Sequence, residues 1–197
     1  MKTMLALALV LGTNAFAQTK EKTTTYTVDP QKTKIEYVGK KVTGQHNGTV
    51  DVKSGNLVFK GAELSAGEII VDMNSMTVED IKEKEYADKF LGHMKSEDFF
   101  NTQKYPESKL VIKKTKKVGS DLEVSGDLTM IGKTQPVNFK VTDWKWSDKE
   151  VTGKAKLVLD RTKWDLRYGS GKFFKGLGDK MIHDDFELMI DLFATRK

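Results

Sequence analysis

The residues that could do chemistry are few and scattered along the chain. His46, His93 and His183 are the only histidines among 197 residues. No two of them are spaced i and i+4, and no metalloprotease motif surrounds them, so the sequence does not indicate a metal site. Two interpretations of His93 stay open: a structural hydrogen bond, or a contact with the polar head of a ligand.

Arg161 follows an alternating segment that ends at Asp160, so its guanidinium lies at the end of a predicted strand. A planar guanidinium suits a phosphate or another polar headgroup, and it suits a neighbouring carboxylate equally well. Both a ligand-binding role and a structural salt bridge therefore remain open for Arg161.

Motifs of catalysis are missing or incomplete. The chain has no cysteine, which excludes thiol catalysis and thiolate zinc sites. The glycine-rich stretch 169–178 lacks the Lys-Ser or Lys-Thr that a phosphate-binding loop requires, so we interpret it as a flexible hairpin loop. No Ser-His-Asp set or carboxylate pair is evident either. We expect no enzyme activity and no cofactor, although distant residues can converge in a fold.

The charge balance indicates a mildly basic, solvated surface. Lysine and arginine number 33 against 28 acidic residues, giving a net charge of +5. The charges are interspersed, and no recognition helix or stacking motif accompanies the lysines, so we expect no nucleic-acid partner. Such a surface is compatible with peripheral contact to anionic headgroups. The oligomeric state stays open, with a homodimer among the alternatives.

The N-terminus carries the features of a secretory signal peptide. Lys2 gives a positive start, residues 4–11 are apolar, and Ala15-Phe16-Ala17 is a small-x-small cleavage signal. An uncleaved anchor is the alternative, but a span needs about 20 apolar residues. The predicted domains are a signal peptide at 1–17, a flexible leader at 18–25 and one globular domain at 26–197, in a periplasmic or secreted protein.

The domain has the period-two alternation of β-strands. Phe186, Leu188, Ile190 and Leu192 alternate with polar residues. Apolar and charged faces that alternate in this way indicate an antiparallel sheet with one wet face. The other strand candidates are 34–41, 49–52, 56–60, 68–73, 110–112, 121–130, 137–142 and 154–160. Many such strands in one domain predict a sandwich or a closed barrel.

One segment, about residues 77–100, departs from this alternation. Val78, Ile81, Tyr86, Phe90 and Met94 have helix-like spacing, so the sequence predicts a short helical insertion there. The Tyr105-Pro106 pair should end it. A helical insertion between two strands of a barrel would lie across an opening or against the wall.

Several segments in one order resemble the YceI-like family over about residues 26–194. They are Tyr26–Pro30, Gly44–Gly48, Val71–Met76, Phe90–Phe100 with Tyr105-Pro106, Gly126–Val137, and Asp160–Trp164 with Tyr168-Gly169. The resemblance implies an all-β, lipocalin-like, up-and-down antiparallel barrel of about eight strands. It also implies a hydrophobic tunnel for a polyisoprenoid chain.

Within that barrel we assign three groups of ligand-binding residues. The inward-facing strand residues are Leu128, Phe139, Leu157 and Leu188. The residues of the helical insertion, which either close the mouth as a lid or pack onto the sheet, are Phe90, Leu91, His93, Phe99 and Phe100. The residues at the end of the strand 154–160 are Arg161 and Trp164, with Trp164 expected to touch the lipid.

Three classes of function are compatible with these residues. The leading hypothesis is a non-catalytic carrier or store of a long-chain isoprenoid or related amphiphile. The second is an enzyme acting on a lipid or quinone-like substrate inside the barrel, which a buried ionisable group facing the tunnel would support. The third is a solidly packed barrel that serves as an envelope adaptor, against which a continuous void would count.

Overall fold

A computed structural model describes residues 22–196 of the chain. The predicted signal peptide at 1–17 and the first half of the leader, residues 18–21, lie outside this range. Thr23–Thr25, also assigned to the leader, already belong to the first strand and pair with β3. The described residues contain no helix that is both long and apolar enough to cross a membrane.

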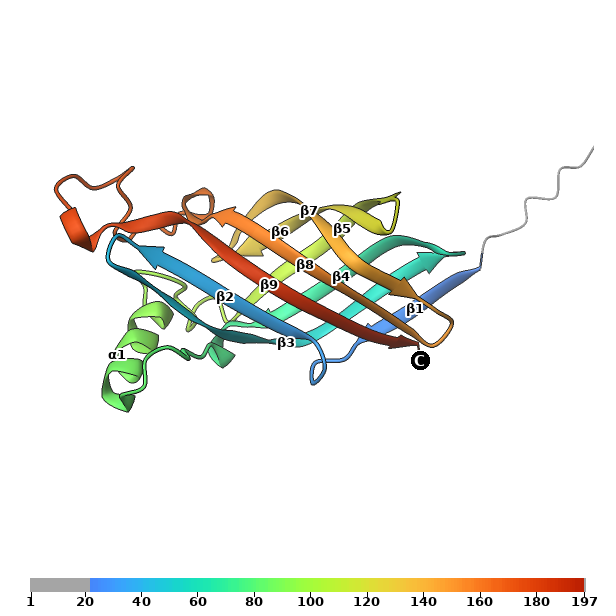
Figure 1. Ribbon diagram of the computed structural model, residues 1–197, viewed down its shortest axis with the longest axis horizontal. Coiled ribbons are helices and arrows are strands. Elements are labelled where there is room, and N and C mark those ends of the chain that lie inside the picture. Colours follow the sequence, from blue (N-terminus) through green and yellow to red (C-terminus); the bar gives the residue numbers. More distant parts are fainter. Residues whose placement is uncertain (1–21, 197) are drawn as a thin grey trace, which may run out of the picture.

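Nine strands and one α-helix make up the described chain (Figure 1). The strands are β1 (Thr23–Val28), β2 (Lys34–Lys41), β3 (Gly44–Lys60), β4 (Glu63–Asp72), β5 (Glu107–Val118), β6 (Asp121–Met130), β7 (Lys133–Trp146), β8 (Glu150–Asp160) and β9 (Ile182–Arg196). The helices are α1 (Lys84–Lys95) and the short 3₁₀ helices η1 (Met73–Ser75), η2 (Arg161–Trp164) and η3 (Gly178–Lys180).

The nine strands fill eight positions around a closed barrel. From β2 to β9 each strand pairs antiparallel with the next in sequence, and β2 pairs with β9 to close the ring. β1 pairs with the C-terminal part of β3 and with the C-terminal end of β9. β1 and β2 therefore occupy the same position in the barrel, one after the other. Closure gives every strand a partner on both sides over part of its length. The predicted all-β, up-and-down barrel of about eight strands is confirmed.

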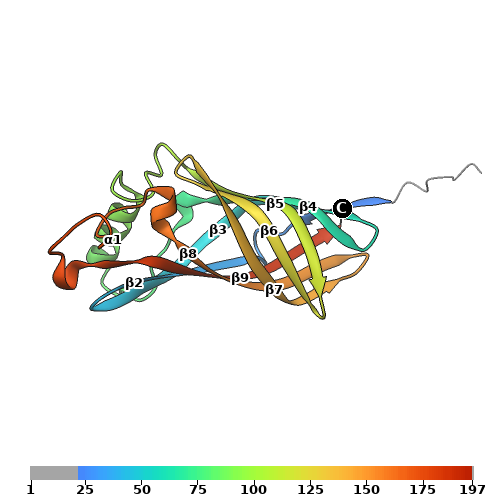
Figure 2. The ribbon, with the colours of Figure 1, turned by 90° about the horizontal axis from the view of Figure 1, so that it is seen from above.

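The two ends of the barrel differ (Figures 1 and 2). At one end, called the mouth here, lie α1, the β2–β3 turn and the long connection 161–181 between β8 and β9. The other end holds the β3–β4, β5–β6 and β7–β8 turns and the end of β9. It is called the closed end here, for the packing described next.

An aromatic plug fills the closed end. The ring of Phe59 stacks on Trp144 and Trp146 with centroids 6.3 and 5.7 Å apart, and it meets Tyr26 edge to face at 5.1 Å. The Tyr26 hydroxyl donates to the Ser147 carbonyl at 2.7 Å, which satisfies the one polar group of a fully buried side chain. Side chains therefore fill this end, and the free space of the barrel lies toward the mouth.

The helical insertion is shorter than predicted. Residues 84–95 form α1, but residues 77–83 do not belong to a helix. β4 pairs with β3 only from Asp51 onward, which leaves the edge of β3 before it open. Backbone N–H groups of Thr77 and Glu79 bond to the carbonyls of Thr49 and Asn47 on that edge. The backbone hydrogen bonds gained by covering this strand edge outweigh the helical preference that the spacing of Val78 and Ile81 indicates.

Gly48 makes this close approach possible. A Cβ atom at position 48 would overlap with the Thr77 carbonyl oxygen and crowd the Tyr37 hydroxyl. Only glycine lets residues 77–79 lie so close to β3. The segment 77–83 thus holds α1 at the mouth like a strap.

Candidate functional site

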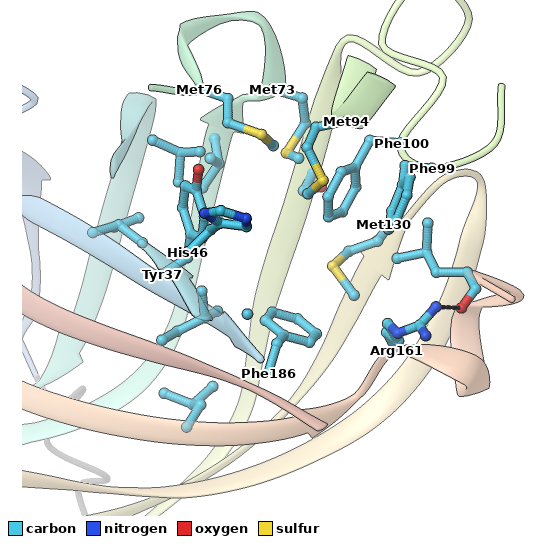
Figure 3. A pocket seen from close by; sticks show the side chains of 18 of the residues that line it. Tyr37, His46, Met73, Met76, Met94, Phe99, Phe100, Met130, Arg161 and Phe186 are labelled. Atoms are coloured by element: carbon cyan, nitrogen blue, oxygen red, sulfur yellow. Dashed lines mark hydrogen bonds between the residues drawn. The ribbon is translucent and has the colours of Figure 1, made fainter. Parts of the chain in front are cut away.

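The barrel encloses a cavity of about 480 Å³ between the plug and the mouth (Figure 3). This volume is within the range of about 300–1,000 Å³ typical of ligand pockets. Its wall is mainly apolar, from Ile35, Val50, Val52, Ile69, Val71, Leu110, Leu128, Leu157, Phe186, Leu188, Ile190 and Leu192. Exposed polar residues border it only toward the mouth, including Lys40, Lys41, Asp179, Lys180 and Asp185. The cavity is therefore a blind apolar pocket with one polar opening.

Alternation along the strands builds this wall. Where β9 and β4 line the cavity, their inward-facing side chains remain only partly buried, although they point into the barrel. They are partly exposed because they border empty space instead of other side chains. The cross-strand pairs Leu157–Leu188 and Tyr37–Leu188 place three wall residues side by side on adjacent strands.

The structure brings eight of the eleven predicted ligand-binding residues to the cavity and leaves three outside its lining. The eight are Phe90, His93, Phe99, Phe100, Leu128, Leu157, Arg161 and Leu188. Leu91 packs against the core from the helix, and Phe139 packs between the two core clusters on β7. Trp164 is the third.

Trp164 is buried to 1% exposure away from the cavity. Its indole Nε1 donates to the Leu128 carbonyl at 2.9 Å, and its ring packs among Met130, Val137 and Leu159. A buried indole needs a partner for its N–H, and this carbonyl supplies one. Trp164 thus supports the wall from behind and does not reach the cavity.

The Arg161 guanidinium is occupied by backbone groups. Its Nε, Nη1 and Nη2 atoms donate to the carbonyls of His183, Leu166 and Ile182 at 3.0, 2.5 and 3.2 Å. Nη2 also lies 3.7 Å from Asp184 Oδ1. Burial lowers the pKa of Arg161, and the fields of Asp184 and Asp160 oppose that shift. The structural interpretation of Arg161 is the one that this geometry favours, because the guanidinium ties the connection 161–181 to the start of β9.

Four methionines that the sequence analysis did not assign also line the cavity. Met73 comes from η1, Met94 from α1 and Met130 from the end of β6, and Met76 lies between η1 and the strap (Figure 3). Unbranched thioether side chains adapt to irregular or mobile partners. This wall suits a flexible hydrocarbon chain better than a rigid ligand.

Two histidines connect α1 to the mouth. His46 Nδ1 lies 2.7 Å from Asp80 Oδ2, and its ring packs on Phe90 of α1 at 4.6 Å. His93 Nε2 lies 3.3 Å from Asp98 Oδ2, and its ring meets Tyr168 edge to face at 4.5 Å. Within residues 22–196 no three His, Asp or Glu side chains gather as a metal site would require.

The Asp80 carboxylate is shared between the strap and β3. Burial alone would raise the pKa of Asp80, but hydrogen bonds from the Asn47 N–H and from His46 outweigh it, so the pKa lies below its ordinary value. The carboxylate thus stays charged and keeps the strap attached to β3 at neutral pH.

Tyr37 is an ionisable group that faces the cavity from β2. Its hydroxyl donates to the Thr77 carbonyl at 2.5 Å, and burial, with the fields of Asp80 and Glu79, raises the pKa of Tyr37 to about 12. An activated tyrosine base needs a shift in the opposite direction. The phenol therefore acts as a tie to the strap.

We expect Tyr37→Phe to remove a tyrosine that ionises near pH 12 in an alkaline titration followed by phenolate absorbance. Because the folded pKa is raised, the stability that Tyr37 contributes is complete below the unfolded pKa of 10.0 and is lost as pH rises through about 12. The stability gap between wild type and variant, about 1 kcal/mol for one hydrogen bond, should shrink over that window. A gap that stays constant from pH 9 to 12 would contradict this assignment.

Comparison with known proteins agrees with this geometry. The profile of the YceI-like domain family matches residues 26–194. Protein YceI of an Escherichia coli strain is 35% identical over an alignment of 128 residues, and the match covers 60% of this chain and 64% of that protein. The match thus spans less than two thirds of the relative's length.

Two solved structures share the fold. BcnA of Burkholderia cenocepacia superposes with a TM-score of 0.63 at 24% identity, covering 85% of this chain and 99% of that one. A polyisoprenoid binding domain from Saccharophagus degradans, implicated in plant cell wall breakdown, gives a TM-score of 0.63 at 18% identity over 87% and 98% of the two chains. At these identities the likeness shows the fold alone. Since the family profile takes in the barrel from β1 to the end of β9, the chain belongs to the YceI-like domain family.

Proposed function

We propose that this chain is an exported, non-catalytic lipid-binding protein that carries or stores a long-chain polyisoprenoid or a similar amphiphile. The observation that carries the proposal is the blind apolar cavity of about 480 Å³ with its single polar opening. The polyisoprenoid binding named for the Saccharophagus degradans relative supports the same class of ligand. The signal-peptide features of residues 1–17 support export.

The lining of the cavity supports one orientation of such a ligand. The hydrocarbon tail lies toward the plug, because mainly apolar side chains line the pocket away from the mouth. The polar head stays at the mouth near Lys40, Lys41 and Lys180, because burying an unpartnered polar head costs several kcal/mol.

The energetics favour reversible loading. Each buried CH₂ is worth about 0.8 kcal/mol relative to water, but the lipid exchanges with a bilayer that is equally apolar. Net transfer between bilayer and barrel is then close to balanced. A balanced exchange suits a carrier or a store.

The other two classes of function have less support. The cavity counts against a solidly packed adaptor, because a tight core holds few voids larger than a water molecule. For an enzyme, the buried ionisable groups that line the cavity within residues 22–196 are Tyr37 and Arg161, and both donate to backbone carbonyls. Neither group is arranged to abstract or deliver a proton.

The test is native extraction. Protein purified from the envelope fraction of its own host is extracted with organic solvent, and the extract is analysed by mass spectrometry. We expect one long-chain isoprenoid or related amphiphile per protein, and a mature N-terminus at Gln18. Only short phospholipids in trace amounts, or no lipid, would contradict the proposal.

A matched pair of substitutions places the lipid in the cavity. Val71→Trp fills the space that Val71 borders, whereas Val158→Trp adds the same bulk on the outer face of β8, where Val158 is 59% exposed. We expect Val71→Trp to reduce the extracted lipid by more than half and Val158→Trp to leave it unchanged. Equal retention in both variants would locate the lipid elsewhere.

A further inference from the structure

Exposed apolar side chains concentrate at the mouth. Among residues 22–196, eight large apolar side chains are exposed, and five of them belong to mouth elements. Phe173, Phe174 and Tyr168 lie on the connection 161–181, where they are 45%, 48% and 43% exposed. Val42 lies on the β2–β3 turn and Tyr86 on α1. Clusters of exposed apolar groups rimmed by polar residues mark interaction surfaces.

The backbone beneath these rings is fixed. The fully buried Ser170 accepts from the N–H groups of Phe173 and Phe174 at 3.1 and 3.0 Å through its carbonyl. Gly169 accepts from the Ile182 N–H at 2.9 Å, and the Val42 N–H donates to Met181 at 3.1 Å. These bonds, which the prediction of a flexible hairpin loop did not anticipate, join the connection to β9 and to the β2–β3 turn. The two phenylalanines are thus presented to solvent by a structured loop.

Cations surround the rings. The stretch 167–180 carries Arg167, Lys172, Lys175 and Lys180 against the single acid Asp179. Within the described residues, Lys175 and Lys180 form no ion pair, whereas Lys172 pairs with Asp160 and Asp184. Lys41, at the end of β2, adds a third cation that forms no ion pair within the same residues. Aromatic rings among unpaired lysines are the composition of a surface that enters an anionic lipid interface.

We propose that the mouth docks on the surface of an anionic lipid bilayer. In this orientation Phe173 and Phe174 enter the headgroup layer, and Lys41, Lys175 and Lys180 meet the acidic headgroups. The inference rests on the proposed lipid-binding function, because Tyr168, Asp179 and Lys180 border both the docking surface and the cavity. Docking at this end lets a hydrocarbon tail pass from bilayer to barrel without crossing water.

The test is flotation of the purified mature protein with vesicles of phosphatidylcholine, with or without phosphatidylglycerol. We expect binding only to the anionic vesicles, and weaker binding as salt is raised. Phe173→Ser/Phe174→Ser should weaken the partition coefficient at least tenfold. Lys175→Glu/Lys180→Glu should weaken it more, since each lysine contributes about fivefold.

Two control variants make equivalent changes at the closed end. Lys116→Glu/Lys117→Glu repeats the charge change there, and Val118→Ser removes an exposed apolar side chain. Both should float like wild type. If the closed-end variants lost vesicle binding as strongly as the mouth variants, the effect would depend on net charge alone, which would overturn the proposal. So would a concentration-dependent dimer of wild type that the phenylalanine variant abolishes, because the rings would then cover each other.

Lipid content separates this proposal from the proposed function. Each variant is loaded from detergent solution with a polyprenyl lipid and extracted afterwards. Full lipid retention with lost flotation in the phenylalanine variant supports docking at the mouth. Wild type that retains lipid but does not float overturns docking alone, and wild type that floats but retains no lipid overturns the proposed function alone.

Discussion

Leu157→Asp is expected to unfold most of the protein or to leave a barrel that no longer retains lipid. Leu157 is 5% exposed on β8, lines the cavity and pairs across the sheet with Leu188. Truncating a buried leucine costs about 2–5 kcal/mol, and placing a carboxylate in an apolar wall adds a desolvation cost. A combined loss of about 4 kcal/mol or more is a large part of the 5–15 kcal/mol that stabilises a typical domain.

Lys156→Asp, one residue earlier, is the matched control. Lys156 faces outward and pairs with Glu187 at 2.8 Å, and Lys40 still pairs with Glu187 when Lys156 is lost. Two neighbouring lysine partners hold the pKa of Glu187 at about 2, so the carboxylate stays charged in either protein at neutral pH. Exposed ion pairs contribute about 1 kcal/mol or less. In urea unfolding followed by tryptophan fluorescence, a loss of stability at position 156 as large as that at position 157 would contradict the assignment of the inner and outer faces of β8.

The alternation of apolar and polar residues along the chain was enough to predict which side chains of β7 and β8 face the interior. Val137, Phe139 and Val141 on β7, and Leu157 and Leu159 on β8, face the interior as their spacing indicates. A period of two is a property of the strand itself, so it can be read without knowing the neighbours. The inward positions of the wall could be predicted for the same reason.

Features that depend on distant partners could not be read in this way. The strap 77–83 has helical spacing but follows the open edge of β3, which exists only because β4 stops pairing at Asp51. Trp164 closely follows the mouth end of β8 in sequence. Its indole nevertheless lies behind the cavity wall, because its N–H donates to a backbone carbonyl of β6. The local spacing of apolar residues carries no information on the open edge of β3 or on the β6 carbonyl.

The methionines of the cavity wall, which the sequence analysis did not assign, differ in whether the sequence could have predicted them. Met73 continues the inward alternation of Ile69 and Val71 on β4, so period two could have assigned it to the cavity. Met76 directly precedes the strap and Met94 lies on α1, and the placement of both segments depends on tertiary contacts. The closed end was also unpredictable, because the stacking of Phe59 on Trp144 and Trp146 joins strands that are far apart in sequence.

Arg161→Ala is expected to destabilise the barrel without changing which headgroup it accepts. The substitution leaves the carbonyls of Leu166, Ile182 and His183 without their donor and removes one of the two cations that lie beside Asp184, the other being Lys172. Removing one partner of a buried ionic cluster typically costs about 3–5 kcal/mol. Lysine at this position keeps the charge but cannot reach three carbonyls in three directions, so Arg161→Lys should lose nearly as much stability.

Headgroup selectivity separates this structural role from a ligand-binding one. A polyprenyl phosphate and a polyprenol with the same tail are titrated into delipidated wild type and Arg161→Lys, at a temperature where both remain folded. Because the guanidinium is already occupied by backbone carbonyls, the two lipids should lose affinity equally. If Arg161 instead held the phosphate, the phosphate lipid alone would weaken, by about tenfold or more, since a hydrogen bond to a charged group contributes about 1.5–3 kcal/mol. In that case the contacts with Leu166, Ile182 and His183 would have to open when the lipid binds.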